Sequence, residues 1–162
     1  VDSALKKDID FELMAERARL KAIDEYNDLA KQFGGEIPKI DIRWSQMLAD
    51  TSFADHTVRR DAYWAQPALA KMKELKIDTF HTDLEDYKCT VEEFGNRAAA
   101  KSIATYALVI DSKWYAKGEM GWFGMSSDSV EQSEWNAKVR EMISGIPDDT
   151  LISIYDCHIW RF

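Results

Sequence analysis

The sequence has few cysteines, histidines and prolines, and it has no long apolar run. Among its 162 residues are two cysteines, three histidines and three prolines. Cys89 and Cys157 are not part of a C-x-x-C motif, so we predict two thiols that are not joined by a disulfide. No stretch of about 18 apolar residues occurs, which argues against a transmembrane helix. The first residues also lack the apolar core of a signal peptide, so we expect a cytoplasmic protein.

Clustered positive charge is missing as well. The formal net charge is −8. Residues 1–88 carry 14 basic and 18 acidic side chains, and residues 89–162 carry 7 and 11, so each part is −4. Because nucleic-acid binding depends on clustered Lys and Arg, a protein partner is favoured over DNA or RNA. Arg59 and Arg60 lie close in sequence to two tryptophans, but we interpret that stretch as amphipathic helices.

The first 88 residues have mainly helical patterns. Apolar residues at near-helical spacing predict a helix over residues 3–33, which Ser3 would cap and Gly34-Gly35 would end. This first helix could join copies of the chain into a homo-oligomer. Shorter helices are expected over residues 42–50, 54–65 and 67–76. Residues 1–88 are therefore predicted to form a helical region.

From Thr90 onward the pattern changes. Thr90-Val91-Glu92-Glu93 is a capping box and predicts the start of a helix. Two runs rich in β-branched and aromatic residues then predict a hairpin around residues 111–113, followed by a helix and an apolar last strand over residues 150–159. We expect this last strand to pair inside the sheet because it is too apolar for an exposed edge.

The predicted fold is therefore α+β, with α-β-β-α-β order over residues 89–162. A helical N-terminal half would pack on a small, mainly antiparallel sheet, because three strands cannot bury two faces by themselves. The two regions are expected to form one compact unit.

Three glycines punctuate residues 118–125, G-E-M-G-W-F-G-M. The phosphate loop of nucleotide-binding proteins ends in Gly-Lys-Ser/Thr, which is absent here, so we do not interpret the segment as a phosphate site. We predict an irregular surface loop in which Gly121 shapes the backbone and Trp122 or Phe123 is exposed as a binding anchor. The alternative, that both aromatic rings cover the open face of the small sheet, remains open.

Asp156 and His158 are the best candidates for chemistry. On a strand they point to the same face, so they could orient an imidazole for acid–base work or supply two metal ligands. A third ligand could come from Glu119, His81 or His56. We favour a structural hydrogen-bonded pair, and we predict no cofactor. A nucleophilic Cys157 is disfavoured, because its neighbour His158 faces the other way.

Two motifs carry a resemblance to a known group of sequences. K-W-Y-A-K-G-E-M-G-W-F-G-M occupies residues 113–125, and I-P-D-D-T-L-I-S-I-Y-D-C-H-I occupies residues 146–159. Together they resemble a family of small uncharacterised phage and bacterial proteins with a Gly-Trp loop after a hairpin and a terminal D-C-H-I strand. The likeness covers residues 90–159, and the extension over residues 160–162 departs from it. The resemblance implies a phage setting, hence the host cytoplasm, and it implies no activity.

The leading hypothesis is a phage-type accessory or regulatory protein that binds a host or viral macromolecule. One alternative is a small metal-assisted hydrolase or nucleotide-processing enzyme that uses Asp156, His158 and Glu119. Another is a structural virion or assembly component. A protein partner is expected before a nucleic acid, and no membrane partner is expected.

Overall fold

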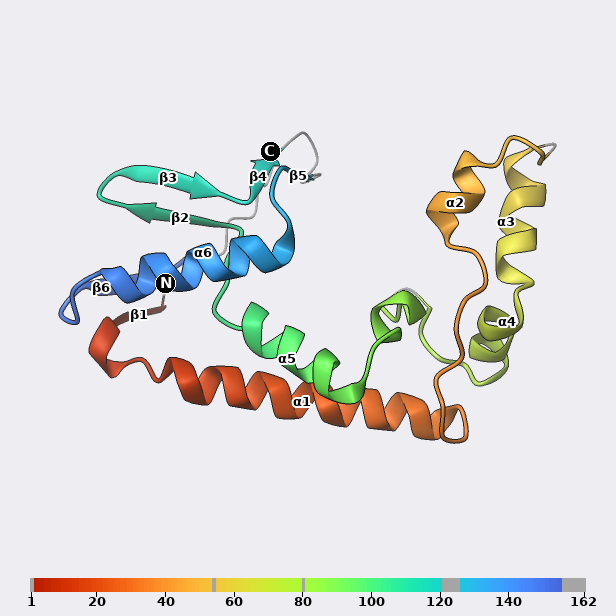
Figure 1. Ribbon diagram of the computed structural model, residues 1–162, viewed down its shortest axis with the longest axis horizontal. Helices are drawn as coiled ribbons and strands as arrows, with labels where there is room; N and C mark the ends of the chain where they lie inside the picture. The colour runs from red at the N-terminus through yellow and green to blue at the C-terminus, as the bar shows by residue number, and fades with distance from the viewer. Residues whose placement is uncertain (1, 54, 80, 121–125, 156–162) are drawn as a thin grey trace. The chain divides into compact units, whose positions relative to one another are not determined.

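The computed structural model describes residues 2–53, 55–79, 81–120 and 126–155 (Figure 1). Over these residues the chain forms six α-helices, two short 3-10 helices and three two-stranded antiparallel sheets, which confirms the α+β class. None of the helices in these ranges is both long and apolar enough to cross a bilayer. The chain divides into two compact units, residues 20–95 and residues 1–19 with 96–162.

The unit of residues 20–95 contains most of helix α1 (Phe11–Gln32). The helix ends as predicted, because Gly34 and Gly35 adopt φ angles of 92° and 130° that favour glycine, and Gly35 N–H donates to Ala30 O. Buried apolar side chains from the helix and from later segments then form one core: Leu29, Ile37, Ile40, Ala68, Leu69, Met72 and Leu84.

Three short helices of this unit confirm the sequence prediction. They are α2 (Trp44–Ala49), α3 (His56–Trp64) and α4 (Pro67–Glu74). Asp55 caps α3 by accepting a hydrogen bond from Val58 N–H, and Pro67 occupies the first turn of α4, where a missing N–H costs nothing. A 3-10 helix, η2 (Leu84–Tyr87), follows α4.

Helix α5 (Val91–Lys101) begins at the predicted capping box. Glu93 N–H donates to Thr90 Oγ1 at 3.1 Å, and Thr90 N–H donates to Glu93 Oε2 at 2.8 Å. Phe94 packs edge-on against Tyr26 of α1, with ring centroids 5.6 Å apart, and stacks on Tyr87 at 4.6 Å. These ring contacts pack α1 on the start of α5.

The second unit begins with a strand that the sequence did not reveal. Strand β1 (Asp2–Leu5) pairs antiparallel with β6 (Leu151–Ile154), and the hydroxyls of Ser3 and Ser153 lie 2.7 Å apart. The prediction that Ser3 caps a helix is therefore wrong. Helix α1 begins at Phe11 instead, and Asp10 accepts a hydrogen bond from Leu13 N–H.

The last strand forms as predicted, but its predicted position inside a sheet is wrong. Among the described residues, strand β6 pairs with β1 alone, so it lies at an edge of this sheet. Leu151 and Ile154 are correspondingly 62% and 58% exposed. The apolar content of β6 therefore did not predict its position in the sheet correctly, because a two-stranded sheet has no interior strand.

The predicted hairpin is present as β2 (Ala107–Ile110) and β3 (Lys113–Ala116). Its two-residue turn uses positive φ angles at Asp111 (49°) and Ser112 (62°), which match the twist of an antiparallel pair.

The segment after this hairpin differs from the predicted irregular loop. Strand β4 (Gly118–Met120) pairs antiparallel with β5 (Ser126–Asp128). The first three residues of the glycine segment are therefore part of a two-stranded sheet. The prediction of a wholly irregular segment is therefore wrong. The stretch between these strands, 121–125, lies outside the described residues.

Helix α6 (Gln132–Gly145) follows β5, as the helix predicted between the hairpin and the last strand. Its N-cap is Glu131, which makes no side-chain capping hydrogen bond. Trp135 and Val139 lie on its buried face and are 1% and 0% exposed. Trp135 Nε1 donates to Thr105 O at 2.7 Å, which ties the helix to the start of the hairpin.

Candidate functional site

Most of the site residues predicted from the sequence lie outside the described residues. This holds for Gly121, Trp122 and Phe123 of the glycine segment and for Asp156 and His158 near the end. Their predicted roles stay predictions.

The remaining candidates, Glu119, His81 and His56, are among the described residues. Glu119 is an exposed residue of β4. His81 pairs with Asp78 at 2.5 Å, and His56 lies edge-on to Trp44 at a centroid distance of 5.8 Å. Within the described ranges, no three His, Cys, Asp or Glu side chains are placed to hold a metal ion. Cys89 is not in a disulfide, whereas Cys157 is outside the described part.

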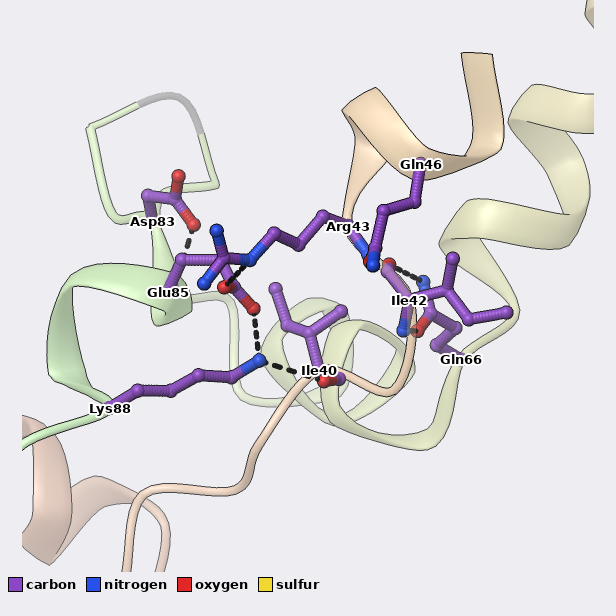
Figure 2. Close-up of polar contacts among 8 residues, drawn as sticks. All are labelled: Ile40, Ile42, Arg43, Gln46, Gln66, Asp83, Glu85 and Lys88. Carbon is purple, nitrogen blue, oxygen red and sulfur yellow. Dashed lines mark hydrogen bonds and ion pairs between the residues drawn. The ribbon is translucent and has the colours of Figure 1, made fainter. Parts of the chain in front are cut away.

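A polar cluster around Glu85 contains two ion pairs, one with Arg43 and one with Lys88 (Figure 2). Both carboxylate oxygens of Glu85 are buried, and one faces Arg43 while the other lies 2.5 Å from Lys88 Nζ. Lys88 also donates to Ile40 O at 3.1 Å. Asp83 accepts a hydrogen bond from Glu85 N–H, which caps η2. A shielded carboxylate is thus balanced by two cations that hold the 40–43 segment to η2.

Gln66 fixes the other side of the same segment. It is 8% exposed, and its Oε1 accepts from Ile42 N–H at 2.8 Å. Its Nε2 donates to Ile42 O at 3.0 Å and to Tyr63 O at 3.1 Å. Figure 2 shows the amide facing the Ile42 backbone much as a paired strand would. A buried amide costs little when its donors and acceptor are satisfied, so this arrangement stabilises the unit.

The Glu85 and Gln66 contacts are therefore structural. The Glu85 carboxylate faces Arg43 and Lys88, and the Gln66 amide faces the backbone of Ile42 and Tyr63. The same surroundings affect Tyr63, because burial raises the pKa of its hydroxyl, and the nearby Asp83 and Glu85 carboxylates raise this pKa further.

The two tryptophans near Arg59 and Arg60 in the sequence, Trp44 and Trp64, both contact Tyr63 of α3. Tyr63 lies edge-on between Trp44 and Trp64, at centroid distances of 5.2 and 5.4 Å. Arg59 lies over the Phe53 ring, and Arg60 pairs with its neighbour Asp61. The rings contact one another across α2 and α3, whereas the Arg60–Asp61 pair lies on the surface, with side chains 53% and 67% exposed.

The β2–β3 hairpin has two large apolar side chains exposed on one face. Val109 and Trp114 are directly opposite each other in the register, so they lie side by side on one face. They are 64% and 66% exposed. Leu108 and Tyr115 form the next cross-strand pair, point to the other face and are half-buried. The hairpin is thus partly buried on one face and presents an apolar pair, the Val109–Trp114 pair, on the other.

The Val109–Trp114 pair was missed in the sequence interpretation, although a signal for it exists. A two-residue turn at 111–112 fixes the register, and this register sets Val109 opposite Trp114. The alternation of a strand then separates this pair from Leu108 and Tyr115. What the pattern could not tell is which of the two apolar faces is covered.

The chain matches no protein-family model, and comparisons with curated proteins and with solved structures found no match either. The resemblance to a phage family therefore rests on its two motifs alone.

Proposed function

We propose that this protein acts by binding another protein, as a phage-type accessory or regulatory factor, and that the Val109–Trp114 pair is the point of contact. The observation that carries the proposal is the exposure of both side chains, 64% and 66%, on the outer face of a hairpin. Tryptophan is enriched among the residues that dominate binding energy, because its large ring buries much area with few rotatable bonds.

A rigid support makes this pair a suitable anchor. The tight turn and the ladder of β2 and β3 fix the backbone under both side chains, and the bond from Trp135 Nε1 to Thr105 O holds the entry to β2. A preorganised anchor loses little conformational entropy on binding, so more of its contact energy contributes to affinity.

The charge around the pair favours a protein over a nucleic acid. Residues 1–19 and 96–162 together carry 11 basic and 14 acidic side chains, a net −3. The nearest charges along the hairpin are Asp111 and Lys113, one of each sign, so no basic stripe is available for a phosphate backbone. We therefore expect the partner to offer an apolar pocket that accepts the indole ring.

Site-specific photo-crosslinking tests this proposal. A photoreactive phenylalanine analogue replaces Trp114 in one variant of the full chain and Leu48 in another. Leu48, which is 49% exposed on α2, serves as the control because it is apolar, exposed and distant in sequence. In bacterial lysate, position 114 should yield a discrete protein adduct that position 48 does not. Equal adducts from both positions, or none from position 114, would contradict the proposal.

A further inference from the structure

We draw no further inference here: the strongest candidate, the small polar cavity at the N-terminus of α6 lined by Lys117, Ser129, Val130, Glu131 and Gln132, carries nothing because none of these residues has a buried side-chain polar atom without a partner and a helix N-terminus alone does not identify a ligand.

Discussion

At the scale of single residues, Glu85 and Gln66 each connect segments that are distant in sequence. Gln66 bonds the Ile42 backbone 24 residues away. Glu85 joins Arg43 to Lys88, and Lys88 reaches the Ile40 carbonyl 48 residues away. Removing Glu85 leaves Lys88, whose side chain is 29% exposed, without its counter-charge, and removing Gln66 leaves the part-buried backbone groups of Ile42 without their side-chain partner. Such a loss should cost more than the loss of an ordinary surface contact.

Replacing Glu85 with Gln should destabilise the fold by about 1–3 kcal/mol, because Arg43 and Lys88 lose their shared counter-charge. The Glu85 side chain is 16% exposed, which limits screening by water. The free energy of unfolding in urea measures the effect. Glu74→Gln is the matched control, since Glu74 pairs with Lys71 at 67% exposure and its loss should change stability by less than about 0.5 kcal/mol. Equal effects of the two changes would argue against a special role for Glu85.

Gln66→Ala should also destabilise the fold by about 1–3 kcal/mol, because it removes hydrogen bonds to both backbone groups of Ile42. Hydrogen exchange of the Ile42 amide should become faster in this variant. Gln46→Ala is the control, because Gln46 accepts a hydrogen bond from the exposed N–H of Arg43 and should cost less. Unchanged protection of the Ile42 amide would show that Gln66 does not hold this segment.

Two tyrosines predict how stability depends on alkaline pH. Burial raises the pKa of Tyr63 and of Tyr87 above the ordinary value of 10.0, and nearby carboxylates add to both shifts. A raised pKa means that the folded state binds the phenolic proton more tightly than the unfolded state. The stability that these two tyrosines contribute is therefore fully present below pH 10, and it is lost as the pH rises through their pKa values in the folded state.

Urea unfolding between pH 9 and 11.5 measures this fall. The double variant Tyr63→Phe/Tyr87→Phe cannot ionise at these positions, so its stability should decline less over the same range. A decline as steep as in the original chain would assign the alkaline loss to other groups.

At the scale of elements, the sequence predicted features that depend on neighbouring residues, but not the pairing of strands that are far apart in the chain. The capping box at Thr90, the glycines after α1 and the proline of α4 each act within a few residues, so their helix ends could be read from the sequence. Strand β1 exists because it pairs with β6, about 150 residues later, and D-S-A-L has no strand pattern by itself. Its pairing prevailed over the helical spacing that had predicted a helix from residue 3.

The same distinction applies to the glycine segment and to the candidate site. Strands β4 and β5 are three residues each, too short for an alternating pattern to show. For the Val109–Trp114 pair, the register followed from the turn, but its exposure depends on which face of the hairpin the rest of the chain covers. Sequence patterns fix such a face only when one side is polar, and here both sides are apolar.

The hairpin turn itself yields a prediction. Ser112 adopts a φ of 62°, which costs a residue with a Cβ more than it costs glycine. Ser112→Gly should therefore raise the stability of the fold by about 0.5–1 kcal/mol, measured by urea unfolding. Ser133→Gly in α6 is the matched control with the opposite expected sign, because glycine weakens a helix. A destabilising Ser112→Gly would mean that the turn is not under this constraint.

At the scale of the whole molecule, the chain has a buried apolar core and also exposes large apolar side chains. The core of residues 20–95 collects side chains from α1, α4 and the segments between and after them. The other unit has three two-stranded sheets and leaves large apolar side chains exposed on two of them, including Trp114, Val109, Leu151 and Ile154. The sequence patterns predicted an α+β protein, but not sheets of two strands each. Such exposed apolar surface is the main physical support for a binding role.

The affinity of the Trp114→Ala variant for the crosslinked partner tests the proposed function most directly. Titration of purified partner should show a Kd at least about 30-fold weaker, equivalent to about 2 kcal/mol, as loss of a central aromatic anchor predicts. The free energy of unfolding should change by less than about 0.5 kcal/mol, because the ring is 66% exposed. Trp135→Ala provides the comparison for a buried ring, with an expected loss of about 3–5 kcal/mol of stability. An unchanged Kd for Trp114→Ala, or a loss of stability as large as that of Trp135→Ala, would contradict the proposal that Trp114 is a binding anchor.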